Sequence, residues 1–367
     1  MDSQRASREE FLRSELFSRT GEAFLDCEIQ PDLFFAHLQS VGEEICAEFI
    51  PGESSFHLVD GIRIQASVNH EYQAVLVYKG MLDFLFRIVS MLVGADRRKR
   101  LPEDQFYEPW SGAVGSWLSG GEFNWEDGRF WWLLDEDYRL GFDATVEGIF
   151  RFLVFHEVGH LHNMHRARRE WRQSGESVHP SMHHAIDYSQ EDASPDRLAA
   201  HVREIVADTY AFQFIFEFNK QRMLLLEELQ AAGNEATCTV AYAISIWHVA
   251  SFFWSLCFIL PSDESQKGLY PSHLFRLKAI EATSLEHGVG GMDSLHAHQA
   301  LHHAMLTYVT MLNPLSEKNE FVHWLLRTND PVHARHYELI CAEVPHWSNT
   351  AFGIRNEVLE FYKSFHP

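Results

Sequence analysis

The chain contains one long stretch without a charged side chain, from Ala236 to Leu260, with the sequence ATCTVAYAISIWHVASFFWSLCFIL. A segment this long and apolar needs surroundings that exclude water, so it must lie in a bilayer or at the centre of a large core. The stretch also carries His248, three serines, two threonines and a tyrosine, which makes its hydropathy borderline for a membrane span. A single crossing would also separate residues 262–367 from the histidine-rich stretch at residues 155–165. We therefore expect a buried core helix, with a membrane helix as the alternative.

The rest of the composition supports a large core. Of the 367 residues, 46% are hydrophobic and 13% aromatic, which is enough to fold as one large domain or two smaller ones without external staples. The formal net charge of −22 and the pI near 5.4 would repel phosphate backbones. Two compact basic runs, RRKR at 97–100 and RARREWR at 166–172, are expected to be solvated helix ends. Nucleic acid is therefore not an expected partner.

The cysteines and the N-terminus indicate a cytoplasmic location. Five cysteines, an odd number with no CxxC spacing, are typical of free, buried thiols in a reducing compartment. The N-terminal sequence MDSQRASREEFLRSELF is polar and charged, and it lacks the apolar segment and small-residue cleavage site of a secretory signal. No secretory signal is therefore expected.

The first part of the chain is expected to contain helices followed by a small sheet. Residues 7–50 show apolar positions at the three- and four-residue spacing of a helix. Apolar alternation then flanks Asp60 and Gly61, a dipeptide that favours a hairpin with a two-residue turn. Residues 72–80 predict a further strand, and residues 81–95 predict a buried helix.

Two segments resist a regular assignment. Residues 101–142 are rich in Trp, Gly and acidic groups, and they are expected to form either a packed irregular loop or a lid over a cleft. Residues 173–194 are expected to form a polar loop that could also cover a cleft.

Two long helices are expected between and after these segments. The first begins near Asp143, which is a good N-cap, and it runs to His165 with apolar residues on nearly all sides. The second begins at the pair Ser194 and Pro195, a cap followed by a first-turn proline, and continues to about Phe218.

The stretch FHEVGHLHNMH lies on the first of these helices. His156 and His160 differ by about 40° around the helix axis and about 6 Å along it, so both imidazoles can reach one zinc ion with bonds of about 2.1 Å. Glu157 points to the flank of that position, where it can take a proton from the water that zinc activates and deliver it to a leaving amine. Gly159 costs the helix about 1 kcal/mol relative to alanine, which indicates close approach of another backbone.

A catalytic zinc site needs a third protein ligand and an open fourth position. An HExxH pattern occurs by chance in roughly one chain in eight of this composition, so a second motif is needed to support the site. The segment REIVADTYA on the second long helix supplies Glu204 and Asp208, four residues apart on one face. Glu204 can bind the metal, and Asp208 can accept the other ring N–H of a ligand histidine.

HExxH on one helix followed by ExxAD on the next resembles the gluzincin branch of zinc metallopeptidases. That branch includes CAAX-processing and membrane-stress peptidases, and the pattern is also similar to a phage-exclusion-type cytoplasmic peptidase. The resemblance implies that zinc is bound by His156, His160 and Glu204. It also implies that Glu157 is the catalytic base and that Asp208 orients a ligand histidine, His156.

A third segment, YPSHLFRL at 270–277, is similar to the His-Pro…Arg-hydrophobic segment that follows ExxAD in those families, with Tyr270 at the expected histidine position. Tyrosine and histidine can each donate a hydrogen bond to a tetrahedral oxyanion, so Tyr270 or His273 is a candidate transition-state stabiliser. Arg276 is a candidate to supply positive charge or to brace acidic partners. The alternative is a plain helix start initiated by the proline.

The remaining histidines are expected to lie outside the chemistry. His162 and His165 follow the ligands at different helical angles and are expected to be structural or solvated. The segment HPSMHH at 179–184 is expected to face solvent, although it could bind a second metal. His298 and His302 are expected on a helix surface, because no acidic residue stands between them at the base position.

We predict an α+β protein, predominantly helical, with a zincin-like metallopeptidase fold and a small sheet at 55–80 beside the active-site helix. Residues 1–54 would form an N-terminal helical region that packs as one unit with a metallopeptidase domain at 55–367. In such folds an edge strand can pair with an extended substrate, so the sheet would serve as a substrate ledge. The expected function is zinc-dependent hydrolysis of peptide bonds in a protein or peptide substrate, with Glu157 as general base.

Two alternatives use the same ligands. One is a zinc-stabilised binding or regulatory module without catalysis, which would have a closed fourth position and would unfold on chelation. The other is an integral-membrane metallopeptidase built on residues 236–260. Substrate specificity depends on pocket shape, which the sequence does not indicate.

Overall fold

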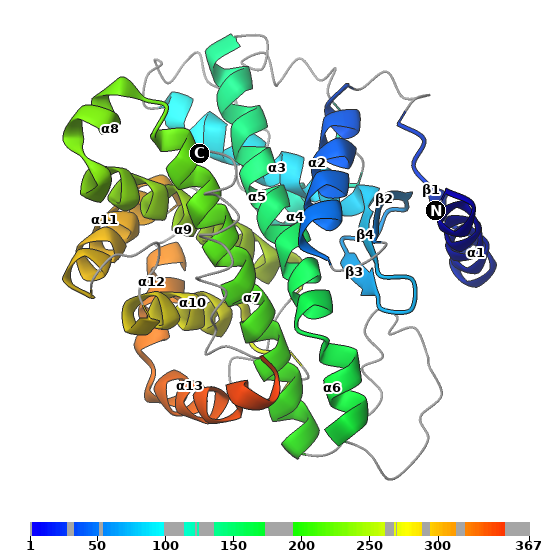
Figure 1. Cartoon of the computed structure of the whole chain (residues 1–367). Helices are drawn as coiled ribbons and strands as arrows, with labels where there is room; N and C mark the ends of the chain where they lie inside the picture. Colours follow the sequence, from blue (N-terminus) through cyan, green and yellow to red (C-terminus); the bar gives the residue numbers. More distant parts are fainter. Residues whose placement is uncertain are drawn as a thin grey trace.

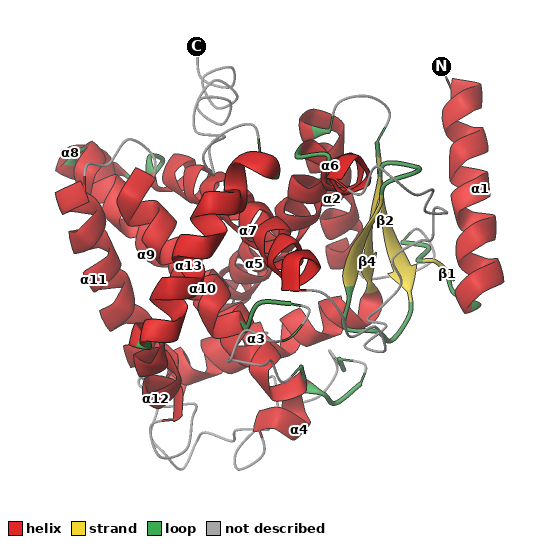
Figure 2. Cartoon of the chain, turned by 90° about the horizontal axis from the view of Figure 1, so that it is seen from below, coloured by secondary structure: helices red, strands yellow, loops and turns green. Residues whose placement is uncertain are grey.

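The protein is predominantly helical, with a small mixed four-stranded sheet at one side (Figures 1 and 2). The computed structural model describes residues 2–27, 33–50, 54–98, 114–121, 123–124, 136–172, 194–260, 268, 270–287, 294–312 and 320–348. The predicted α+β, mainly helical class is therefore confirmed. The described strands are β1 (Ala23–Phe24), β2 (Ser55–Asp60), β3 (Ala66–Asn69) and β4 (Ala74–Tyr78).

The helices precede, separate and follow these strands. The first seven in chain order are α1 (Asp2–Thr20), α2 (Leu33–Phe49), α3 (Lys79–Arg98), α4 (Val114–Leu118), α5 (Glu136–His162), α6 (His165–Arg172) and α7 (Ser194–Met223). The others that the structure describes are α8 (Glu227–Ala232), α9 (Asn234–Ile259), α10 (His273–His287), α11 (Ser294–Leu312), α12 (Glu320–Leu326) and α13 (Pro331–Glu343). Short 3₁₀ turns, η5 (Arg327–Asn329) and η6 (Val344–His346), follow α12 and α13.

Two predicted loops fall largely or wholly outside the described residues. Of the segment 101–142, the structure describes α4, a few residues after it and the first part of α5. The polar loop at 173–193, which includes the histidines of HPSMHH, lies outside the described residues.

The sheet has the strand order β1-β2-β4-β3, and the hairpin predicted at Asp60 and Gly61 is wrong. Strand β2 pairs in parallel with β4, while β3 pairs with β4 in antiparallel fashion. After Gly61 the chain instead passes the start of α3, where the amide of Gly80 donates to the carbonyl of Gly61 at 2.8 Å. Strand β4 (AVLVY) is buried at all five positions, so it occupies the centre, where both of its edges are paired.

The N-terminal helices cover both faces of this sheet. Helix α1 lies against one face, where Leu12 and Leu16 pack on a cluster that includes Leu76 of β4. On the other face, Phe56 and Val75 belong to the main hydrophobic core together with residues of α2, α3 and α5. Figure 2 shows the strands between α1 and the remaining helices. The predicted N-terminal helical region, residues 1–54, therefore shares its core with the rest of the chain.

Helix α5 differs from the sequence prediction at both ends. It begins well before Asp143, so this residue is not an N-cap; its carboxylate instead accepts a hydrogen bond from Arg139 within the helix at 2.9 Å. It also ends before His165, because Met164 adopts a left-handed backbone conformation with a φ of 50°. Helix α7, in contrast, begins at Ser194 as the Ser-Pro pair predicted.

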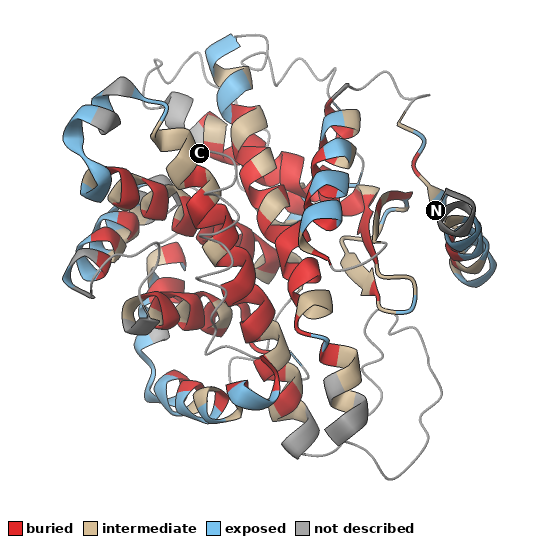
Figure 3. Cartoon of the chain, viewed as in Figure 1, coloured by how far each residue is buried: buried red, intermediate tan, exposed pale blue. Residues whose placement is uncertain are grey.

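The uncharged run forms most of α9, which packs against α5, α7, α10 and α11. Most of this helix is buried (Figure 3), as the core-helix prediction requires. Its buried polar groups are partly paired: the Asn219 amide donates to the Ser245 hydroxyl at 2.9 Å. Among the described helices, α9 is also long and apolar enough to cross a membrane; a single helix of this kind occurs both in membrane proteins and in the cores of soluble ones.

Helices α5 and α9 approach closely at Gly148. A methyl group added there would overlap the imidazole ring of His248 on α9, which is itself buried. Gly141, earlier in α5, is exposed, and apart from its chain neighbours and the backbone of its own helix no atom lies within 4 Å of the position that a Cβ would occupy. Gly148 is therefore tightly packed and Gly141 is exposed, although both lie in the same helix.

We predict that Gly148→Ala destabilises the protein, whereas Gly141→Ala stabilises it. Overpacking a core costs about 1–3 kcal/mol, which exceeds the helix-propensity gain of up to about 1 kcal/mol that either alanine provides. Urea denaturation followed by circular dichroism would measure both changes. Equal stabilisation by the two alanines would contradict the close contact between α5 and α9.

Candidate metal centre

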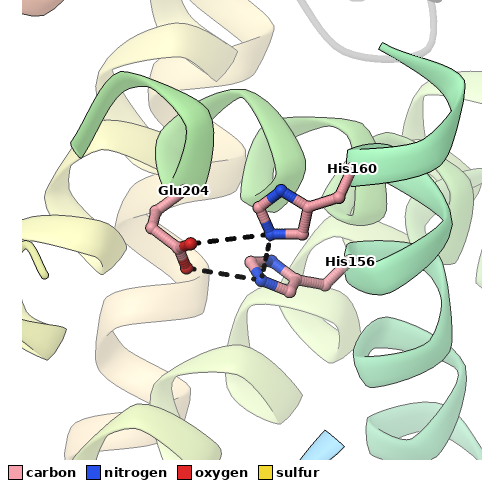
Figure 4. Close-up of side chains that lie close together, drawn as sticks. All are labelled: His156, His160 and Glu204. Atoms are coloured by element: carbon pink, nitrogen blue, oxygen red, sulfur yellow. Dashed lines mark hydrogen bonds and ion pairs between the residues drawn. The ribbon is translucent and has the colours of Figure 1, made fainter. Parts of the chain in front are cut away.

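The candidate metal centre contains the two histidines of the HExxH motif. His156 and His160 lie one turn apart on α5, and their Nε2 atoms are 3.2 Å from each other. Both rings point toward α7, as Figure 4 shows. Helix α5 is buried from Phe152 to Gly159, and His160 is half-buried, so packing around this part of the helix holds the two rings in place.

Glu204 on α7 faces these rings. Its Oε2 lies 3.5 Å from Nε2 of His156, and its Oε1 lies 3.6 Å from Nε2 of His160 (Figure 4). One nitrogen or oxygen from each of the three residues falls within 4.8 Å of the others. The three residues therefore form a group that could hold a metal ion.

Gly159, within the HExxH motif, allows α5 and α7 to approach closely enough for this group to form. A Cβ on Gly159 would lie 3.1 Å from the Cα of Ala207 and 3.3 Å from the ring of Tyr210, both on α7. Real Cβ atoms are rarely so close to a backbone atom, so a larger side chain would push the helices apart. The close backbone approach predicted from Gly159 is confirmed, and the neighbouring helix is the one that carries Glu204.

The donor spacing fits zinc. Zinc bonds to imidazole nitrogen and carboxylate oxygen are about 2.0–2.2 Å long, so neighbouring donors in a tetrahedral site are roughly 3.4 Å apart. Here the two histidine nitrogens are 3.2 Å apart, and the two oxygens of Glu204 lie 3.5 Å from Nε2 of His156 and 3.6 Å from Nε2 of His160, one oxygen to each ring. Two imidazoles and one carboxylate also form a donor set that catalytic zinc centres use, with three protein ligands rather than four.

Asp208 and Arg276 lie behind the first ligand. The Nδ1–H of His156 donates to Oδ1 of Asp208 at 2.9 Å, which leaves Nε2 directed at Glu204. Asp208 has no exposed surface, and Arg276 of α10 donates to both of its oxygens at 2.6 and 2.7 Å. The predicted second hydrogen bond of a ligand histidine is therefore made to His156, and Arg276 braces the acidic partner.

The charges of this group compensate one another. Burial alone would raise the pKa of Asp208, but Arg276 holds it below its usual range. Burial also opposes protonation of His156, yet hydrogen bonds to Asp208 and Glu204 outweigh it and raise the pKa of the imidazole to about 10. Burial would raise the pKa of Glu204, whereas His156 and His160 hold it well below its usual range. A divalent cation would displace the proton of His156, because ligand histidines must be neutral.

Glu157 differs from the other carboxylates. Burial raises the pKa of its carboxyl group to about 7, and the nearby carboxylates of Glu204 and Asp208 act in the same direction, against His156 and Arg276. A carboxyl group with this pKa can exchange a proton near neutral pH. Its position beside the first ligand is the one that the sequence predicted for a general base.

The YPSHLFRL segment is only partly at the site. Arg276 contacts Asp208 directly and also lies over the ring of Phe253 at 4.8 Å. His273 is buried and its Nε2 lies 3.2 Å from the carbonyl of Leu260, while Tyr270 is half-exposed. In the described part of the chain, none of the three metal-site residues hydrogen-bonds to Tyr270 or His273, so a role for either in catalysis stays a prediction.

Two further histidines lie near the ligands: His165, which the sequence predicted to be structural or solvated, and His70, which sequence reasoning missed. His165 is 2% exposed and its Nδ1 lies 2.8 Å from Nδ1 of His160, so of the two expectations for it, structural and solvated, the first applies. His70, which follows β3, acts electrostatically on His160 and His165 and so lies near them. Neither stands at ligand spacing in the sequence. His162 instead packs on Tyr210, at 5.1 Å between ring centroids.

Comparison of the whole chain with protein-family models, curated proteins and solved structures finds no match. The resemblance to gluzincins is therefore confined to the motif residues themselves. A functional assignment depends on the chemistry of the buried site and on the elements that surround it.

We predict that the purified protein binds one zinc ion per chain and that Glu204→Ala does not. Loss of a direct ligand should weaken binding by more than the roughly 10–100-fold that loss of an outer hydrogen-bond partner causes. Metal analysis of the purified proteins would measure this, with His162→Ala as the matched control in the same region. Retention of one zinc per chain in Glu204→Ala would contradict the assignment of the third ligand.

We predict that Arg276→Ala lowers the free energy of unfolding by about 3–5 kcal/mol, because it leaves the Asp208 charge buried without its guanidinium partner. The control is Arg13→Ala, which breaks an exposed pair with Glu9 and should cost no more than about 1 kcal/mol. Chemical denaturation of the metal-free proteins gives both values. Similar small losses for the two variants would argue against a structural role for Arg276.

Proposed function

We propose that the protein is a zinc-dependent endopeptidase with a zincin-like arrangement of its motifs. The observation that carries the proposal is the group of His156, which is buried, with His160 and Glu204, which are half-buried, and with buried Glu157 next to the first ligand. Three ligands with a carboxylate beside them are the set that zinc-dependent hydrolysis requires. A zinc ion held only for stability is more typically bound by four protein ligands.

His156, His160 and Glu204 would hold the metal, and the remaining residues would serve the reaction around it. Zinc, when bound in such a site, polarises a carbonyl group and lowers the pKa of water. Glu157 would accept a proton from the attacking water and return it to the leaving amine. Asp208, braced by Arg276, would keep the Nδ1 proton of His156 in place so that Nε2 faces the metal.

The position of the sheet supports a peptide as the substrate. Strand β3 lies at the edge of the sheet, and in the described part of the chain it pairs with β4 on one side and with no strand on the other. It also packs against α5, and His70 at its end lies near His160. Because an extended peptide can add to such an edge through main-chain hydrogen bonds, β3 is our proposed substrate ledge.

The cellular setting is part of the same proposal. None of the five cysteines forms a disulfide, which supports the reducing conditions of the cytoplasm. The net charge of −22 would disfavour strongly acidic protein substrates.

We predict that Glu157→Gln keeps zinc bound but reduces peptide hydrolysis by about 10²–10⁴-fold, the usual contribution of a general base. Digestion of a mixed peptide library followed by mass spectrometry would measure hydrolysis, with metal analysis of the same samples. Glu147→Gln is the matched control, since Glu147 lies on α5 in an ion pair with Arg151. Undiminished hydrolysis by Glu157→Gln would refute the assigned base. Bound zinc without hydrolysis by the unmodified protein would favour a zinc-stabilised module instead.

A further inference from the structure

We propose that His165 is a positioning residue for His160: it accepts the Nδ1–H of that ring and so keeps the Nε2 lone pair directed at the metal. The proposal rests on the metal centre of the proposed function and extends it to a residue outside both motifs. Its starting observation is the separation of 2.8 Å between Nδ1 of His160 and Nδ1 of His165.

The hydrogen bond between His160 and His165 determines which ring nitrogen of each histidine carries the proton. A neutral imidazole has one N–H and one lone pair. Because Nε2 of His160 faces Glu204 and His156, ligation through that atom requires its proton on Nδ1. The Nδ1–H then donates to Nδ1 of His165, so His165 must carry its own proton on Nε2. The reverse arrangement would place a proton on Nε2 of His160 and block ligation.

The backbone turn after α5 directs His165 toward this contact. The amide and the side-chain Nδ2 of Asn163 both donate to the carbonyl of Gly159, at 3.1 and 2.8 Å. Met164 then adopts its left-handed conformation, which is uncommon for a residue other than glycine, and such backbone outliers cluster at functional sites. The turn starts α6 at His165 and returns this side chain to the ring of His160.

Packing keeps the ring of His165 in that orientation. Trp347, which follows η6 near the end of the described chain, meets it edge-on with centroids 6.3 Å apart. The guanidinium of Arg203 in turn lies over the ring of Trp347, 4.9 Å from its centroid. Only 2% of His165 is exposed, so surrounding side chains hold the ring in the orientation of its hydrogen bond to His160.

A neutral hydrogen-bond partner for His160 avoids adding a further negative charge to the site. His156 already has a carboxylate partner in Asp208, and the site also contains Glu157, which is buried, and Glu204, which is half-buried. A fourth carboxylate, placed beside His160, would require a further compensating cation. An imidazole supplies the hydrogen-bond acceptor without adding a negative charge.

The test compares zinc affinity in variants of the full chain. His165→Leu removes the acceptor, whereas His165→Asn offers an amide oxygen close to the position of Nδ1. We expect zinc affinity, measured by competition with a chromophoric chelator at fixed pH, to fall by about 10–100-fold in His165→Leu and to recover most of that loss in His165→Asn. His162→Leu, which changes a neighbouring histidine packed on Tyr210, should leave the affinity unchanged.

The possible outcomes separate this inference from the proposed function. If the unmodified protein binds zinc through Glu204 and all His165 variants bind it equally well, the role of His165 is refuted while the metal centre stands. Equal loss in His165→Leu and His165→Asn would indicate a packing role and also refute it. If the unmodified protein binds no zinc, or if Glu204→Ala binds it undiminished, the metal centre itself fails, and the inference fails with it.

A measurement without substitutions covers the case in which His165→Leu does not fold. Nitrogen-15 NMR of the zinc-loaded protein with labelled histidine reports which ring nitrogen carries each proton. We expect His160 protonated on Nδ1 and His165 protonated on Nε2. A proton on Nδ1 of His165 would overturn the proposed direction of the hydrogen bond.

Discussion

The close approach of α5 and α7 is the contact on which the candidate site depends. Gly159 has no side chain, so the backbone of α5 comes to the distance from Ala207 at which His156 and Glu204 meet. A wider helix separation would place the carboxylate beyond the reach of any ion that both histidines hold. The residue that weakens α5 as an isolated helix is therefore the one that allows the donor group to form.

This helix contact places the carboxylate of Asp208 in the core, and other elements compensate its charge. Asp208 is fully buried one turn after Glu204, and a buried carboxylate without a partner would be strongly unfavourable. Helix α10 supplies Arg276, although it provides no metal ligand. The turn into α6 supplies His165 beside His160. The site therefore requires at least four helices, of which two carry the donor atoms.

Local sequence signals correctly predicted the elements whose structure depends on residues close together in the sequence. The start of α7 at Ser194, the core helix over the uncharged run and the strand at β4 all follow from caps, length or apolar content. The hairpin at Asp60 and Gly61 failed because strand pairing is not local: β4 is buried on all sides and lies between the two strands that the turn would have joined. Asp143 failed as an N-cap because Arg139 pairs with it inside a longer helix.

The sequence by itself determined the order and spacing of the donor groups. Helical geometry places His156 and His160 on one face, and Glu204 and Asp208 on another, whatever surrounds them. Tertiary structure alone decided that Arg276 braces Asp208, that His165 meets His160 and that β3 forms the sheet edge beside α5. The physical reason is that residue spacing sets angles within one helix, whereas the distance between helices depends on how side chains remote in sequence pack together.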